Sequence, residues 1–253
     1  MPSEAFLNEM YGRDYLDCHY SAELNGGVSN QETGRELDRV VGMLVERRPG
    51  GTVLDVGCGA GRFLMAARSA GLRPEGFERL ASTADAVSQV TAAKVHAGEL
   101  GALGGQYDAV HIADVLEHCA RPEDLLLRLR RRLAPGGVLI ARGPLENQLN
   151  LLQQTVRLSR LTRACLRELP PTTMPPYHLI LFTLAGWKAL FDRCGMRVLH
   201  EEIYEWRWPA PERFTLRPVS VLKELSLILS RSRLGQSRRM GNRVVSILAA
   251  GAC

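Results

Sequence analysis

Apolar residues follow two spacings along the chain, and these spacings predict its strands and helices. Short consecutive apolar runs rich in β-branched residues are typical of buried parallel strands, whereas apolar residues recurring every three or four positions indicate helices. Strands are expected at 52–56, 73–78, 94–96, 107–112, 138–142, 196–203 and 244–250, and helices at 31–47, 62–70, 82–90, 122–133, 151–169, 184–194 and 219–234. Strands and helices therefore alternate over most of the chain.

This order of elements predicts an α/β fold. Parallel neighbouring strands need crossover helices between them, so regular alternation favours a doubly wound sheet. We expect a Rossmann-like, mostly parallel sheet of seven strands with a helical lid insertion. The N-terminal arm and first helix occupy 1–48, the first half of the core 49–145, the lid 146–182, and the second half of the core with a helical excursion 183–253.

The strand at 52–56 leads into a turn with three glycines, Gly57, Gly59 and Gly61, and then into a helix. Glycines let a ligand approach the backbone amides at the N-terminus of a helix. The spacing is G-x-G-x-G, which differs from the G-x-G-x-x-G of dinucleotide-binding folds. Glu78 lies 21 residues after Gly57, where nucleotide-binding folds place an acid against ribose hydroxyls.

Residues 54–61 read Leu-Asp-Val-Gly-Cys-Gly-Ala-Gly, which resembles the first motif of the class I S-adenosylmethionine-dependent methyltransferases. The resemblance implies that Asp55, Cys58 and the three glycines contribute to cofactor binding. It covers residues 35–145 well and 175–253 more loosely. Within this family the chain resembles small-molecule O-methyltransferases of ubiquinone, sugar and natural-product biosynthesis.

The same resemblance extends to the residues that would surround the adenosine. Glu78 takes the position of the ribose ligand, and the neighbouring Arg79 either lies beside the adenosine or points to solvent. Glu99 matches the acid that meets the adenine amino group, although aspartate is more frequent in the family, and Leu100 matches the residue that stacks on the ring.

The fourth strand and its continuation also resemble the family. The buried strand at 107–112 begins with a tyrosine and an aspartate, and a Leu-Glu-His sequence follows at 116–118. Ala113 and Asp114 come directly after the strand, where open parallel sheets bind ligands. A Leu-x-Pro-Gly-Gly turn at 133–137 then introduces the fifth strand.

The resemblance places a candidate catalytic residue, His178, at the end of the lid. A neutral imidazole there would accept the hydroxyl proton as the methyl group is transferred. The alternative is a histidine that fastens the lid, and His118 is the reserve candidate. The lid helix carries regularly spaced arginines, which either form a solvated face or attract an anionic acceptor or an anionic membrane. They are Arg157, Arg160, Arg163 and Arg167.

Composition narrows the function classes further. The six cysteines are scattered without a C-x-x-C pair, and no Asp-Asp-Asn cluster of the catechol-methyltransferase type is apparent, so no metal is expected. The net charge of +5 is too small to argue for nucleic-acid binding. With neither a signal-peptide pattern nor an apolar run of membrane-spanning length, the expected location is cytoplasmic.

These observations predict an S-adenosylmethionine-dependent methyltransferase that acts on a small molecule, at a hydroxyl oxygen. An N- or C-methyltransferase of the same fold is the nearest alternative. A dinucleotide-dependent oxidoreductase shares the strand–glycine–helix beginning but not the glycine spacing. A non-catalytic binding subunit with this fold is the alternative from a different class, although it has no need of an intact glycine turn.

Overall fold

A computed structural model describes residues 31–146, 178–206, 218–234 and 239–251 of the chain. Its centre is one seven-stranded sheet with the order β3-β2-β1-β4-β5-β7-β6. The strands are β1 (Thr52–Val56), β2 (Arg73–Glu78), β3 (Val95–Ala97), β4 (Tyr107–Ala113), β5 (Leu133–Pro144), β6 (Met196–Tyr204) and β7 (Arg243–Ala250). The first five are parallel, and β7 runs antiparallel to both of its neighbours. The expected mostly parallel, doubly wound sheet is confirmed.

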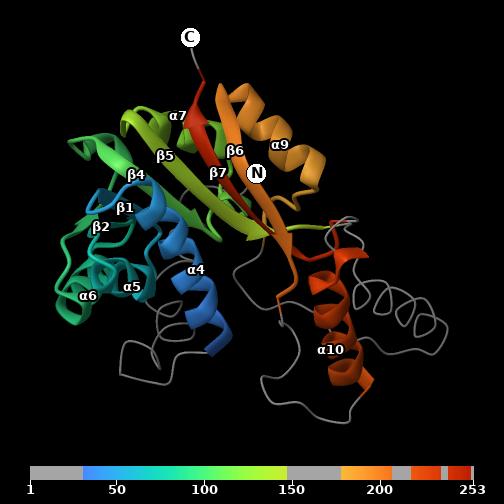
Figure 1. The fold of residues 1–253 in the computed structure, drawn as a ribbon. Helices are drawn as coiled ribbons and strands as arrows, with labels where there is room; N and C mark the ends of the chain where they lie inside the picture. Colours follow the sequence, from blue (N-terminus) through green and yellow to red (C-terminus); the bar gives the residue numbers. More distant parts are fainter. Residues whose placement is uncertain (1–30, 147–177, 207–217, 235–238, 252–253) are drawn as a thin grey trace, which may run out of the picture.

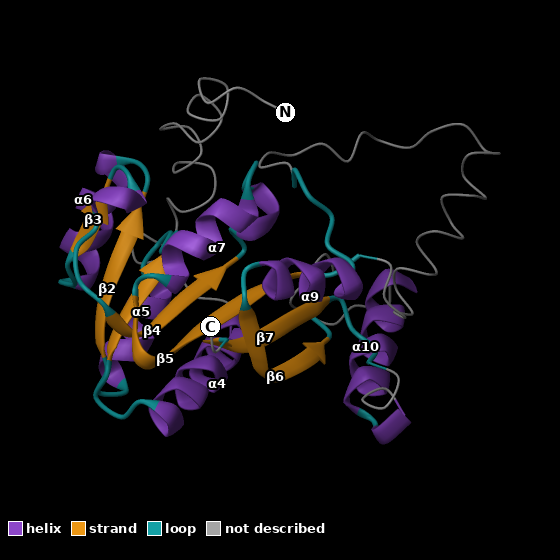
Figure 2. Ribbon diagram, turned by 90° about the horizontal axis from the view of Figure 1, so that it is seen from above, coloured by secondary structure: helices purple, strands orange, loops and turns teal. Residues whose placement is uncertain are grey.

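Helices cover both faces of the sheet, as Figures 1 and 2 show. The helices are α4 (Gln31–Arg47), α5 (Arg62–Ser69), α6 (Ala81–Thr91), α7 (Pro122–Arg130), α9 (Leu184–Arg193) and α10 (Pro218–Arg231). Helices α4 and α5 pack on one face, and α7 and α9 pack on the other. Helix α10 lies beyond the end of β6. In the described part of the chain, no helix has the length and apolar character that a membrane crossing needs.

The core has two halves because successive strand residues point to opposite faces of the sheet. Val53 of β1 and Ile140 of β5 pack against α4 and α5. Leu54 of β1 and Leu139 of β5 pack on the other face, against α7 and α9. Trp187 of α9 is fully buried there, and its indole N–H donates to the Ser246 hydroxyl at 3.0 Å.

Most boundaries agree with the expectation to within one or two residues, and the larger differences are at the ends of α7 and α10 and at the start of β5. Helix α7 ends at Arg130 instead of Leu133, because Leu133 already pairs with Tyr107 at the start of the sheet. The Pro-Gly-Gly segment at 135–137 lies within β5 and interrupts its pairing with β4, which becomes regular again at Val138. The lid helix expected at 151–169, with its four arginines, lies outside the described residues.

Candidate functional site

The glycine turn sits at the carboxyl end of β1 and has a left-handed backbone. Gly57, Gly59 and Gly61 have φ angles of 70°, 52° and 75°, which favour glycine over residues with a side chain. The N–H groups of Gly57 and Cys58 donate to the carbonyl of Phe77 at 2.9 and 3.4 Å, which ties the turn to β2. Burial raises the pKa of the Cys58 thiol, and the nearby carboxylates of Asp55 and Glu78 raise it further.

Close packing also explains two of these glycines. A Cβ atom at Gly57 would lie 2.6 Å from Cγ2 of Val115, in the loop after β4. A Cβ atom at Gly61 would lie 2.4 Å from Cγ2 of Thr91 and 2.8 Å from Cγ1 of Val87 in α6. Both positions are therefore required by packing as well as by backbone conformation.

Glu78 faces the glycine turn from the end of β2. Its Oε1 accepts a hydrogen bond from the Gly59 N–H at 2.8 Å, and its Oε2 accepts one from the Arg79 N–H at 3.3 Å. Burial raises the pKa of the carboxyl, the two N–H donors oppose this, and the Asp55 charge adds to it. The Glu78 carboxylate thus meets the glycine turn at the carboxyl edge of the sheet, where the sequence predicted a ribose ligand.

Asp55 is engaged within the sheet. It is 3% exposed, and its Oδ1 lies 2.7 Å from Nδ1 of His111, its partner on β4. Burial lowers the pKa of His111, although the Asp55 charge opposes this effect. Phe63, from the first turn of α5, stacks on the imidazole with ring centroids 3.8 Å apart. This arrangement fixes the end of β1 from which the glycine turn begins.

The three residues predicted to surround the adenine differ in their exposure. Glu99 and Arg79 are exposed. Leu100 is only 8% exposed and belongs to the apolar core with Leu54 and Phe77, so little of its side chain is open to a ligand.

The end of β4 lies beside the glycine turn. Ala113 is half-buried and Asp114 is exposed. Asp114 has a φ of 54°, which is rare for a residue other than glycine. Its two carboxylate oxygens both accept from Nη2 of Arg243 at 2.7 Å. Desolvation raises the pKa of Asp114, but the Arg243 guanidinium outweighs this effect and lowers the pKa overall.

The structure brings together the two candidate histidines, His118 and His178, although they are 60 residues apart in the sequence. Their ring centroids are 5.0 Å apart in an edge-to-face arrangement. The N–H groups of Leu179 and Ile180 donate to the carbonyl of Glu117 at 2.7 and 3.0 Å, which holds the segment after His178 against the end of β4. His178 itself is exposed.

Glu117 was part of a recognised motif, but sequence reasoning assigned it no role. Its side chain is 1% exposed, and neither carboxylate oxygen has a hydrogen-bond partner among the residues that the structure describes. Burial, and then repulsion by Asp114, raise the pKa of this carboxyl to about 8. The apolar pattern around it gives no sign of this environment.

A buried network of charges near the same edge was also missed. Arg142 of β5 forms an ion pair with Glu36 of α4, with Nη1 and Oε1 2.9 Å apart and both side chains 8% exposed. Tyr204 donates from its hydroxyl to Glu36 and accepts from Nε of Arg243. The Arg243 guanidinium lies over the Trp206 ring, 4.3 Å from its centroid. One sign of this network was present in the sequence, because Arg142 lies in an otherwise apolar strand.

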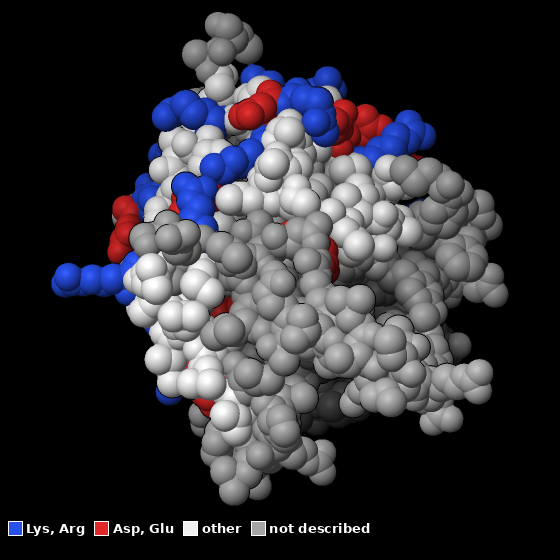
Figure 3. Space-filling view, turned by 90° about the vertical axis from the view of Figure 1, so that its right-hand side faces the viewer, with Lys and Arg blue, Asp and Glu red and all other residues white. Residues whose placement is uncertain are grey.

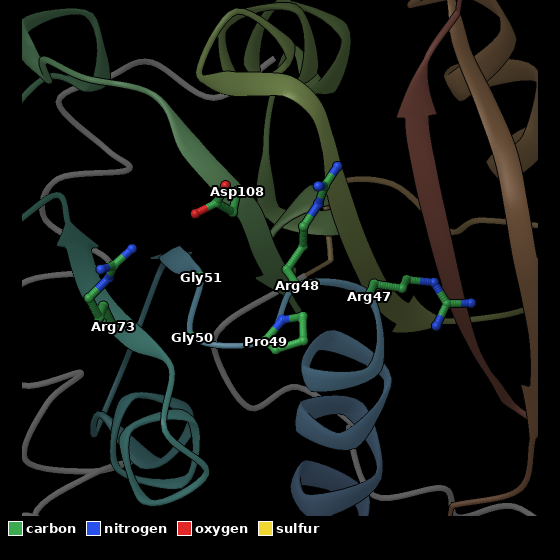
Figure 4. A pocket seen from close by; sticks show the side chains of 7 residues that line it. All are labelled: Arg47, Arg48, Pro49, Gly50, Gly51, Arg73 and Asp108. Atoms are coloured by element: carbon green, nitrogen blue, oxygen red, sulfur yellow. The ribbon is translucent and has the colours of Figure 1, made fainter.

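A pocket of about 250 Å³ lies at the opposite, amino edge of the sheet (Figure 4). Arg73 and Asp108 line it from strands on either side of β1, and Arg47 points away from them. Its remaining lining residues are Arg48, Pro49, Gly50 and Gly51. This pocket is separate from the glycine turn. On the side of the molecule that faces the viewer in Figure 3, which is the right-hand side of Figure 1, basic and acidic side chains are interspersed in the upper part.

The sheet order, the glycine turn at the end of β1 and the acid at the end of β2 define the class I methyltransferase fold. A family described as a methyltransferase domain matches residues 30–201, which is more than half of the chain. The chain therefore belongs to this family, and it is an S-adenosylmethionine-dependent methyltransferase, as the glycine motif predicted. No curated protein sequence matches the chain.

Solved structures share the fold at low sequence identity. Magnesium protoporphyrin IX methyltransferase from Synechocystis PCC 6803, with bound SAH, is 16% identical with a TM-score of 0.63, over 97% of this chain and 99% of that one. A putative methyltransferase from Haloferax volcanii, in complex with the Trm112 activator, is 16% identical with a TM-score of 0.62, over 97% and 98%. A putative sarcosine dimethylglycine methyltransferase from Galdieria sulphuraria is 14% identical with a TM-score of 0.59, over 94% and 99%.

Proposed function

We propose that the protein transfers the methyl group of S-adenosylmethionine to a hydroxyl oxygen of a small molecule. One observation carries this proposal: the glycine turn with Glu78 lies beside a strand end that presents His118 and His178. The first part suits an adenosine cofactor, and the second supplies an imidazole that can take up a proton. The magnesium protoporphyrin methyltransferase, which shares the fold and holds SAH, supports the choice of cofactor.

In this proposal the cofactor occupies the carboxyl edge of the sheet. The amides of Gly57, Cys58, Gly59 and Gly61 approach its methionine portion, and Glu78 exchanges its bond with the Gly59 N–H for bonds to the ribose hydroxyls. The adenine lies near Arg79, Glu99 and the exposed margin of Leu100. Ala113 and Asp114 border the sulfonium from the end of β4. Asp55 acts indirectly, by holding the end of β1 through His111.

The reaction is a direct displacement at the methyl carbon. An oxygen lone pair of the acceptor forms the new C–O bond while the C–S bond breaks, and sulfur keeps the bonding electrons as SAH forms. The hydroxyl proton passes to the ring nitrogen of His178. The protein contributes chiefly by aligning donor and acceptor and by excluding water from the reacting atoms.

The test is the turnover of His178→Ala on the protein's own hydroxyl acceptor, measured as SAH release. We expect turnover to fall by ~10²–10⁴-fold, the usual range for loss of a general base. The affinity for SAH should stay within about twofold, because His178 faces the acceptor side. His200→Ala is the matched control, since His200 lies in β6 and takes no part in the proposed site.

The pH dependence of turnover gives a second measure of the same variant. The wild-type profile should have a limb that the His178→Ala profile lacks. Near-normal turnover by a folded His178→Ala protein would refute the assignment. An amine acceptor, which needs no dedicated base, or a carbon acceptor would then explain the site better.

A further inference from the structure

Glu117, His118 and His178 form one cluster of potential metal ligands. Each offers one ligand atom, and these three atoms all lie within 4.8 Å of one another. The cluster combines the short 3-10 turn Leu116–His118 with the segment that begins at residue 178. Because the backbone bonds from Leu179 and Ile180 to Glu117 fix these two segments together, the approach of the ligands is a property of the fold.

The Glu117 side chain is the second observation that points to a ligand. Only 1% of its surface is exposed, and neither oxygen has a hydrogen-bond donor within the described residues, since the neighbouring Asp114 carboxylate can only accept. Buried polar groups in folded proteins are almost always hydrogen-bonded, and a buried charge needs a counter-charge. The Arg243 charge favours an ionised Glu117, but Nη2 of Arg243 already binds both oxygens of Asp114.

We propose that Glu117, His118 and His178 bind a divalent first-row transition metal ion, with Zn²⁺ the best match. Two imidazoles and one carboxylate are the donors of many catalytic zinc and iron sites, in which at least one coordination position stays open. Magnesium fits less well, because it prefers an all-oxygen environment. Among the described residues no cysteine belongs to the cluster, so cysteine spacing gave no indication of it.

The size of the cluster agrees with this occupant. A point equidistant from three atoms with separations of 4.8 Å lies about 2.8 Å from each of them. Zinc–nitrogen and zinc–oxygen bonds are about 2.0–2.2 Å long. Each ligand atom therefore has to move by less than about 1 Å, and the exposed His178 is the least confined of the three side chains.

The inference rests on the proposed methyl transfer to a hydroxyl oxygen and changes one step of it: the proton acceptor would no longer be His178. With the ion bound, the acceptor hydroxyl occupies the open position, and coordination lowers the pKa of that hydroxyl. The proton then leaves to solvent from the bound hydroxyl, while His178 serves as a ligand instead of a free base. A metal-free enzyme was expected because the sequence has no compact metal-ligand motif, whereas these ligands lie up to 61 residues apart.

The experiment measures metal binding alone, without methyl donor or acceptor. The full chain, freed of any affinity tag and treated with a chelator, is titrated with Co²⁺, followed by visible absorption and by metal analysis after dialysis. We expect one Co²⁺ per chain with a d–d spectrum typical of four- or five-coordinate cobalt, and displacement of that signal by Zn²⁺. Glu117→Gln, His118→Ala and His178→Ala should each weaken binding more than about tenfold.

His200→Ala is the matched control and should bind cobalt as the wild type does. His178→Ala keeps the test decisive if the two less exposed variants fail to fold, because His178 is exposed. The proposal is overturned if the wild type binds no cobalt, or if folded His178→Ala binds it unchanged. In that case Glu117 would be buried in its protonated, neutral form without a metal ion. The proposed methyl transfer with His178 as the base would not be affected by this result.

Discussion

The buried ion pair between Glu36 and Arg142 yields a quantitative prediction about stability. It joins α4 to β5 beneath the edge where the cofactor is proposed to bind, and both side chains are 8% exposed. Glu36→Met removes one partner and leaves the Arg142 guanidinium buried without its counter-charge. Loss of one partner from a buried pair costs about 3–5 kcal/mol, because the remaining charge has lost its compensation.

The cost should be visible in thermal unfolding. For a domain of this size, each kcal/mol lowers Tm by roughly 2–4 °C, so Glu36→Met should unfold about 6–20 °C below the wild type. The double variant Glu36→Met with Arg142→Met replaces both charges by apolar side chains and should recover most of this loss. Asp124→Asn is the control, because its ion pair with Arg121 is exposed and should be worth less than about 1 kcal/mol.

Differential scanning calorimetry of the wild type, Glu36→Met, Arg142→Met and the double variant gives the double-mutant cycle. The reasoning is refuted if Glu36→Met melts within about 2 °C of the wild type, which corresponds to a loss of less than about 1 kcal/mol. It is also refuted if the double variant is as unstable as the sum of its two single changes. Either result would mean that Glu36 and Arg142 are solvated separately in solution.

Two further changes test the packing. Gly61→Ala should lower the free energy of unfolding far more than Gly71→Ala. Both glycines have a positive φ, but only at Gly61 would a Cβ atom clash with other atoms. Urea denaturation of both variants measures the difference. Equal losses would contradict the clash. Ser246→Ala leaves the buried Trp187 indole N–H without an acceptor and should cost about 1–3 kcal/mol in the same assay. An unchanged midpoint would mean that the indole finds another acceptor.

Much of the fold could be predicted from the sequence because its elements have strong local signals. Consecutive apolar runs marked the strands, and the three glycines marked the turn after β1. The position of Glu78 followed from spacing, since a helix crossover places the next parallel strand beside the first with its end at the same edge. Its carboxylate does lie on the backbone of that turn, at Gly59.

The parts that escaped prediction depend on contacts between distant segments. His118 and His178 were each noted, but their approach depends on hydrogen bonds between backbone groups, which any residue pair can form. The partner of Arg142 is Glu36, on a helix more than a hundred residues earlier. Leu100 lies after the third strand as expected, and its packing against Leu54 and Phe77 could not be predicted from its position in the sequence. Tertiary packing decided all of these cases.

The most direct test of the central claim is calorimetric titration of SAH into the purified protein and into Glu78→Ala. The account predicts one SAH per wild-type chain and at least tenfold weaker binding to a folded Glu78→Ala protein, because the charged hydrogen bonds to the ribose are lost. Glu75→Gln is the matched control: Glu75 lies on the same strand but bonds to His96 and Tyr107, and its variant should bind normally. Equal SAH affinity in wild type and Glu78→Ala, or no binding to either, would contradict the proposed cofactor site.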